Sequence, residues 1–314
     1  MIQTVLGPVD EQALGYTLAH EHMLLLNAQM RFAVPEWFNE EAYFARTLPR
    51  IERLRKAGVD AVIDATPLNL GRDARILAEL SRRSGLAIIA STGLYFFEDP
   101  FVRSPDPQRL AELFVREINV GMQGTDVRAG VIKCATDAQG VTPCNRTMLE
   151  AAALASRQTG KPILTHTCSA DFSAKNALEQ QAALLGSGAA PERVVIGHCG
   201  DSNDLDYLTR ILQNGTYIGL DRFGHDSFNT TEKRIGTLLE LLERGWEDRI
   251  VLSHDDAFYT DYWRSWQTDP CENPSAVRGM LDVPQRVLPE LRRRGVTEKI
   301  IDKLMRDNVR KLFA

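Results

Sequence analysis

The chain has 314 residues, a formal net charge of −5 and a sequence pI near 5.8, and it carries no long basic run, which argues against a nucleic-acid partner. Its first residues lack the basic region and apolar core of a signal peptide, and no stretch is long and apolar enough to span a bilayer. We therefore expect a globular protein that does not bind membranes. Because the five cysteines form no Cys-x-x-Cys pair, we interpret them as reduced thiols of a cytoplasmic protein.

Short apolar segments alternate along the chain with segments of helical periodicity. We expect strands at 17–22, 59–65, 86–92, 129–133, 162–166, 194–198, 216–221 and 249–255. Helices are expected at 40–57, 107–122, 146–159, 174–185, 202–213 and 231–244. Eight strand–helix units predict an α/β fold, a (β/α)₈ TIM barrel that occupies residues 1–314 as a single domain. A doubly wound open sheet is the alternative, but no Gly-x-Gly-x-x-Gly motif follows any expected strand.

Polar residues fall at the C-terminal ends of the expected strands, where barrel enzymes place their chemistry. These residues are His20, His22, Lys133, His166, His198 and Asp255. Residues i and i+2 of a strand share a face, so His20 and His22 can point at the same object. A single histidine is more often a hydrogen-bonded structural residue. Four of the chain's six histidines at matching positions instead favour a metal centre, because neutral imidazoles suit Zn²⁺.

Lys133 does not fit a metal site as a bare ammonium group, because it would repel the cation and would be costly to bury unpaired. If its amine captured CO₂, the resulting carbamate would be an anionic ligand with two oxygens, able to bridge two cations. Asp255 would add a second negative charge, and the set could then hold two divalent ions. A salt bridge from Lys133 to a neighbouring carboxylate is the alternative, and the sequence leaves it open.

Several motifs resemble those of the amidohydrolase superfamily and, more closely, of its phosphotriesterase family. They are TVLGP (4–8), TLAHEH (17–22), KCAT (133–136) and VIGHCGD (195–201). Within that family, GLY (93–95) and GLDRFG (219–224) resemble the phosphotriesterase-like lactonases. The resemblance covers essentially the whole chain and implies a barrel with a dinuclear metal centre and a carboxylated lysine.

The resemblance also implies a role for each site residue. His20, His22 and Asp255 would bind the more buried metal, and His166 and His198 the more exposed one. Carbamylated Lys133 and a hydroxide would bridge the two metals, for which Zn is the first expectation and Co, Fe or Mn are alternatives.

The expected function is hydrolysis of lactone rings, either N-acyl-homoserine lactones in quorum quenching or other γ- and δ-lactones, by attack of the bridging hydroxide. Asp255 would accept the hydroxide's proton, Tyr95 would hydrogen-bond to the hydroxide or the substrate, and Arg222 would position the ring. Promiscuous organophosphate triesterase activity and a homodimer are also expected. One alternative is a primary organophosphate or aryl-ester hydrolase. Another is a non-catalytic barrel that binds a hydrophobic ligand.

Neighbouring residues receive structural interpretations. His254 is next to Asp255 and should face the helices, whereas His225, Asp226 and Asp256 are expected in loops at the rim. Cys168 is not needed as a ligand.

The segment 257–266 contains five aromatic residues. We expect some of them, including Trp263 and Trp266, to line an apolar channel together with Phe223 and Phe228. The alternative is that they cover the barrel mouth or contact another subunit.

Overall fold

The computed structural model describes residues 1–103, 106–169, 175–262 and 279–314. Within these residues, eight parallel strands form one sheet and follow one another in chain order. They are β3 (Thr17–Glu21), β4 (Ala61–Asp64), β5 (Ala87–Gly93), β6 (Val131–Ala135), β7 (Ile163–His166), β8 (Val194–Ile196), β9 (Tyr217–Leu220) and β10 (Ile250–Leu252). All eight expected strands are therefore confirmed, each trimmed or shifted by a few residues.

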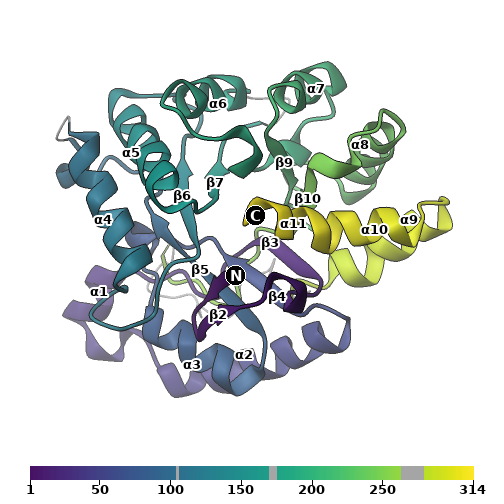
Figure 1. Cartoon of the computed structure of the whole chain (residues 1–314). Coiled ribbons are helices and arrows are strands. Elements are labelled where there is room, and N and C mark those ends of the chain that lie inside the picture. The colour runs from purple at the N-terminus through teal and green to yellow at the C-terminus, as the bar shows by residue number, and fades with distance from the viewer. Residues whose placement is uncertain (104–105, 170–174, 263–278) are drawn as a thin grey trace.

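The sheet curves until its first and last strands meet. Beyond the end of β10, the Asp255 amide donates to the carbonyl of His20 over 3.0 Å, and His22 pairs in parallel with Ala257. Helices surround this nearly closed barrel (Figure 1). The predicted (β/α)₈ barrel is thus confirmed.

The helices of the outer ring include all six that the sequence predicts. They are α1 (Ala28–Ala33), α2 (Glu40–Lys56), α3 (Ala74–Ser84), α4 (Pro107–Asn119), α5 (Pro143–Thr159), α6 (Ala177–Gly186), α7 (Leu205–Gln213), α8 (Thr231–Glu243), α9 (Leu288–Arg293), α10 (Glu298–Asp302) and α11 (Asn308–Leu312). The helices α1, α3, α9, α10 and α11 are not among the predicted ones. Neither is a hairpin of β1 (Ile2–Thr4) and β2 (Gly7–Val9).

Local sequence signals fix where these helices begin and end. The Asp73 side chain accepts from the Ile76 amide at the start of α3, and Thr142 caps α5 in the same way ahead of Pro143. Both helices end at a glycine with φ of +70°, a backbone conformation that residues with a Cβ rarely adopt. The strands that follow therefore start at defined positions.

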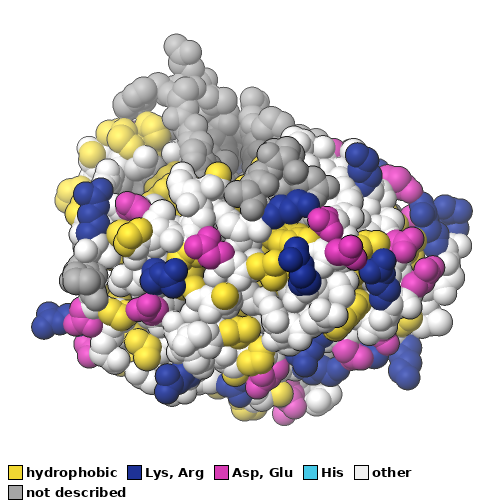
Figure 2. Space-filling model, turned by 90° about the horizontal axis from the view of Figure 1, so that it is seen from above, with side chains coloured by type: hydrophobic (Ala, Val, Ile, Leu, Met, Phe, Trp, Pro, Cys, Tyr) yellow, Lys and Arg dark blue, Asp and Glu magenta, His cyan; other side chains and the backbone are white. Residues whose placement is uncertain are grey.

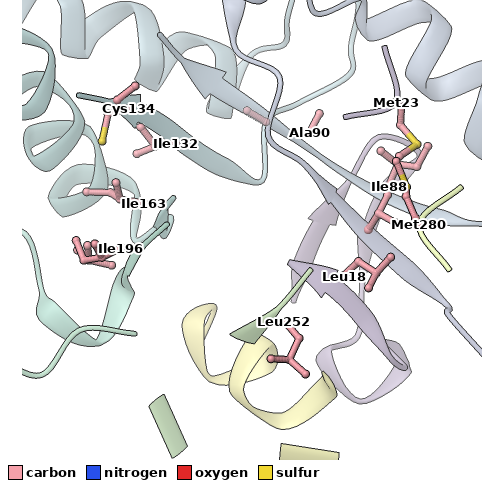
Figure 3. Packing of buried hydrophobic residues seen from close by; sticks show 14 of the residues in the cluster. Leu18, Met23, Ile88, Ala90, Ile132, Cys134, Ile163, Ile196, Leu252 and Met280 are labelled. Atoms are coloured by element: carbon pink, nitrogen blue, oxygen red, sulfur yellow. The ribbon is translucent and has the colours of Figure 1, made fainter. Parts of the chain in front are cut away.

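Two hydrophobic layers hold the barrel. Residues on the outer face of the strands pack against the helices, as Ile132, Cys134 and Ile163 do in Figure 3. Residues on the inner face form a separate cluster that includes Val131, Leu164 and the two ends of the chain near the barrel axis. This inner cluster fills the lower half of the barrel.

The surface carries charges of both signs, interspersed over the face that Figure 2 shows. No helix in the described part of the chain is long and apolar enough to cross a membrane.

Candidate metal centre

The six residues predicted as ligands meet at the C-terminal mouth of the barrel. One possible ligand atom from each of His20, His198 and Asp255 lies within 4.8 Å of the other two. His22 Nε2 is 3.2 Å from Asp255 Oδ1, and Lys133 Nζ is 2.7 Å from His20 Nε2. The fourth imidazole adjoins them, because His166 Nδ1 is 2.8 Å from His198 Nε2. Residues more than 230 positions apart thus form one cluster.

Strand β3 directs two imidazoles inward and a carboxylate outward. Its register against β4 shifts between Leu18 and Glu21, and His20 and His22 face the barrel mouth. Glu21 points the other way, where it accepts from Ser253 Oγ and His254 Nδ1, each over 2.7 Å. The prediction that His254 is structural and faces away from the centre is confirmed. Its Nε2 accepts from the backbone amide of residue 283 over 2.9 Å.

Two of the candidate ligands sit on left-handed backbone. His198 has φ of +58° and Asp255 has φ of +56°, which is uncommon for residues with a Cβ. Each follows the end of its strand, β8 or β10, and the turn sends the side chain back over the barrel mouth. Such conformations cost free energy and concentrate at functional sites.

Each imidazole has one ring nitrogen within 3.2 Å of a group outside the cluster. The pairs are His20 Nδ1 with Asp221 Oδ2 at 3.2 Å, His22 Nδ1 with Thr66 Oγ1 at 2.8 Å, His166 Nε2 with Asp137 Oδ2 at 3.2 Å, and His198 Nδ1 with Asp221 Oδ1 at 2.9 Å. A carboxylate only accepts hydrogen bonds, so the nitrogens of His20, His166 and His198 that face Asp221 or Asp137 carry the protons.

The opposite nitrogens are therefore lone pairs that face the centre. His166 Nδ1 and His198 Nε2 meet at 2.8 Å with no proton between them, an arrangement that is repulsive unless a cation accepts both lone pairs. Burial also lowers the pKa of His166 to about 4, which keeps this ring neutral at physiological pH. Neutral imidazoles whose outer N–H groups bond to carboxylates are typical of metal ligands. The donor set thus fits a divalent metal.

The Lys133 side chain points inward from β6 and is buried, with 1% of its surface exposed. Desolvation lowers the pKa of its amine to about 8, although Asp255 and Asp221 oppose the shift. Among the described residues no ion pair joins Lys133 to a carboxylate, and its amine contacts His20 instead. A substantial fraction of the amine is accordingly neutral near pH 8, the form that reacts with CO₂.

Asp255 is held by an arginine that is itself clamped. Arg222 Nε donates to Asp255 Oδ2 over 2.9 Å, and its Nη1 donates to Asp201 over 2.7 Å. Asp201 also accepts from buried Arg234 over 2.8 Å. Burial alone would raise the pKa of Asp255, but electrostatic attraction to the His198 imidazole and to the charged Arg222 guanidinium outweighs burial and holds that pKa well below the usual value. Asp255 is therefore an ionised acceptor at neutral pH.

A cavity of about 380 Å³ opens over the cluster. Its described lining residues are His22, Leu25, Leu70, Tyr95, Lys133, His166, Arg222, His225, Phe228, Asp255, Ala257 and Thr260. Tyr95 and Arg222, to which the resemblance assigns catalytic roles, both line this cavity. The wall is mainly apolar, and the cluster supplies the polar groups, as in many small-molecule sites.

The aromatic predictions are partly wrong. Phe228 lines the cavity, but Phe223 is 1% exposed and packs in the outer core, because it points away from the mouth. Phe258 and Tyr259 also belong to that core, which supports the packing alternative for them. Trp263 and Trp266 lie outside the described residues. Asp256 lies in the loop after β10, as predicted, but not at an exposed rim, because its side chain is buried and its backbone amide donates to Glu21 Oε2 over 3.1 Å.

Sequence reasoning missed the groups that orient the imidazoles. Asp221 directly follows β9, so the rule that selected Asp255 also applied to it. Thr66 and Asp137 each lie two residues beyond the end of a strand, and no motif distinguishes them. Whether their side chains contact a histidine depends on the conformation of the turns after β4 and β6, which only the structure shows.

A parallel barrel with histidines, a buried lysine and a carboxylate at its C-terminal mouth defines the class of barrel hydrolases with a metal-binding site. The family model described as the phosphotriesterase family matches residues 1–313. The chain belongs to the phosphotriesterase family, a family of metal-dependent hydrolases, and is therefore an enzyme.

Individual relatives span nearly the same length. The "phosphotriesterase homology protein" of Mycobacterium tuberculosis is 35% identical over 322 residues, covering 99% of this chain and 97% of the relative. The "aryldialkylphosphatase" of Saccharolobus solfataricus is 34% identical over 313 residues, covering 98% and 97%. A solved structure from molecular engineering of organophosphate hydrolysis on "a weak promiscuous lactonase template" is similar with a TM-score of 0.90 and 32% identity, covering 100% of this chain and 99% of that one.

Proposed function

We propose that this protein is a metal-dependent lactonase that opens γ- or δ-lactone rings, N-acyl-homoserine lactones among them. The observation that carries the proposal is the 2.8 Å approach of His166 Nδ1 to His198 Nε2 beside an apolar cavity, while the opposite nitrogen of each ring faces a carboxylate. His20, His22 and Asp255 would hold one divalent metal, and His166 and His198 a second. Zinc is the expected metal, since the set combines neutral imidazoles with carboxylate oxygen.

Lys133 completes the set as a carbamate. Its neutral amine nitrogen attacks CO₂ and releases one proton, which yields an anionic group with two oxygens between the two half-sites. The depressed pKa of the amine supplies the reactive form, and two metals would stabilise the product. The carbamate also removes the positive charge that a buried ammonium would place beside the cations.

Two divalent cations bound here would lower the pKa of a bound water and polarise the substrate carbonyl. The protein's own groups perform the proton transfers. Asp255, ionised and fixed by Arg222, accepts the proton of the attacking water and delivers it to the leaving alkoxide. Burial raises the pKa of Tyr95, so its phenol stays protonated and can donate a hydrogen bond to the substrate.

The apolar wall supports a lactone with an alkyl or acyl chain. Leu25, Leu70 and Phe228 offer contact area to such a chain, while the polar groups gather at the cavity floor. The likeness to a solved structure built on a lactonase template supports the same class of substrate.

A second candidate is hydrolysis of organophosphate triesters. It is favoured by the 34% identity to a relative named aryldialkylphosphatase, and the same centre would serve both reactions. A phosphoryl oxygen would replace the lactone carbonyl, and an aryl alkoxide would leave.

A pH-indicator assay of protein with known metal content separates the two. γ-Lactones, δ-lactones and N-acyl-homoserine lactones are compared with a diethyl aryl phosphate. We expect lactones to be turned over with the higher kcat/KM. Triester turnover equal to or above lactone turnover would favour the second candidate, and hydrolysis of neither by the metal-loaded protein would contradict both.

A further inference from the structure

One imidazole of the cluster is held differently from the others. The partners of His20, His22 and His198 are Asp221 and Thr66, which are 1% and 0% exposed. His166 instead bonds to Asp137, whose side chain is 29% exposed and lies in the turn after β6. No motif marks Asp137, and the reaction outlined above does not use it.

The geometry around His166 determines which nitrogen carries its proton. Asp137 Oδ2 lies 3.2 Å from Nε2. The Tyr95 hydroxyl lies 3.4 Å from both ring nitrogens, and its ring meets the imidazole at 69°. A hydroxyl that lies equally far from both nitrogens favours neither of them as the proton carrier, so it does not select a tautomer. Among the described residues, Asp137 is the group that selects the tautomer of His166.

We propose that Asp137 is a positioning residue that holds His166 as the Nε2–H tautomer and so presents Nδ1 to the more exposed metal. The inference rests on the proposed function, because it assumes a metal at this nitrogen. A carboxylate behind a ligating imidazole fixes the ring and raises its basicity. Asp137 therefore controls the affinity of one of the two metal positions.

The turn around Asp137 is built to hold this carboxylate in place. Its Oδ1 accepts from the Ala138 amide over 2.6 Å, which leaves Oδ2 for His166. Its backbone carbonyl accepts from the Gly140 amide over 2.8 Å and from the Asn176 side-chain amide. Asn176 in turn accepts from Thr167 Oγ1, next to His166, over 2.5 Å. The carboxylate and the imidazole are thus fixed to a common frame.

The Asp137→Asn substitution tests the assignment because both carboxylate oxygens are in use. The amide has one acceptor atom and cannot serve both the Ala138 amide and the His166 Nε2–H. With the amide oxygen on Ala138, its NH₂ group faces Nε2 and favours the tautomer with the proton on Nδ1. Glu179→Gln is the matched control. Glu179 contacts the same turn, where it accepts from the Val141 amide over 3.4 Å, but it touches no imidazole.

The experiment loads wild type, Asp137→Asn and Glu179→Gln with Zn²⁺ alone and titrates each with a chromophoric chelator. We expect Asp137→Asn to release one of its two metals at roughly 10–100-fold lower chelator concentration, with the other unchanged. Glu179→Gln should match wild type, and urea unfolding checks that all three are folded. Equal metal affinity in wild type and Asp137→Asn would overturn the proposal. A wild-type protein that binds no zinc would instead contradict the proposed function itself.

Histidine ring ¹⁵N shifts of zinc-loaded wild type give a second readout that needs no substitution at Asp137. We expect a protonated Nε2 and a metal-bound Nδ1 for His166. A proton on Nδ1 of His166 would overturn the proposal even if Asp137→Asn failed to fold.

Discussion

The interior of the barrel has an apolar lower half and a polar upper half, and on β6 and β7 two consecutive inward-facing residues lie on either side of the boundary. On β6, Val131 belongs to the apolar cluster and Lys133, two residues later on the same face, belongs to the candidate metal centre. On β7, Leu164 and His166 are related in the same way. One strand pattern thus serves stability below and chemistry above.

The two halves have opposite energetics. Each apolar side chain buried below contributes about 1.5–3 kcal/mol to folding. Charged groups buried above cost free energy unless each is paired, which the bonds of Asp221, Asp201 and Arg222 achieve. Substitutions in the lower half should therefore change stability, and substitutions in the upper half should change activity.

The largest expected effect is on activity, from Asp255→Asn in the upper half. Loss of the proton acceptor should reduce lactone turnover by ~10²–10⁴-fold, while the melting temperature stays close to that of wild type. Steady-state kinetics and calorimetry on the same preparation measure both. Lactone turnover at the parent rate would show that Asp255 is not the base.

Leu164→Ala is the counterpart in the lower half. Removing this fully enclosed side chain should cost about 2–5 kcal/mol of unfolding free energy through lost burial and a cavity. Turnover per folded, metal-loaded molecule should stay within about twofold, because the cavity lies below the polar half. Urea unfolding and kinetics test the pair of statements, and a tenfold fall in kcat at full metal content would show that the halves are coupled.

Asp256 provides a pH-dependent test behind the polar half. Burial, with repulsion from Glu21, raises its pKa to about 7. Because this value exceeds that of the unfolded chain, the folded protein holds the proton more tightly. The protonated Asp256 carboxyl therefore contributes its full stabilisation of the folded state below about pH 4, and this stabilisation is lost as the pH rises through 7. Asp256→Asn should therefore gain about 2–4 kcal/mol over wild type at pH 8, and little at pH 4. A gain independent of pH, measured by urea unfolding, would contradict this assignment.

The smallest expected effect comes from Tyr95→Phe. The lost hydroxyl removes one hydrogen bond to the substrate, worth ~0.5–1.5 kcal/mol, without changing the shape of the wall. The ratio of lactone to triester kcat/KM should fall by about 2–10-fold. An unchanged ratio would show that the Tyr95 hydroxyl does not distinguish the substrates.

The sequence predicts the upper half better than the groups that support it. Strand periodicity locates His20, Lys133 and Asp255, together with the rule that barrel enzymes place functional residues at the C-terminal ends of their strands. The strand backbone restricts the direction of a side chain at such a position. Asp137 and Thr66 escape prediction since their reach depends on turns after the strands. Phe223 is misplaced for the same reason, as its direction depends on the backbone that follows β9.

The outer ring shows a similar limit. α3 has a clear apolar face and a capping Asp73, so both its period and its start can be read from the sequence. A π-helical segment, Val283–Val287, leads into α9, and a second one, Lys303–Asp307, joins α10 to α11; both disturb the helical period of the sequence.

The most direct test of the account is the molar ratio of divalent metal to protein chain, measured by mass spectrometry on wild type and Lys133→Ala. The account predicts about two metals per wild-type chain. It predicts a clear loss of metal in Lys133→Ala, with activity partly restored by short carboxylic acids that replace the carbamate. Wild-type protein that hydrolyses lactones without bound metal, or a Lys133→Ala variant with unaltered metal content and full activity, would contradict it.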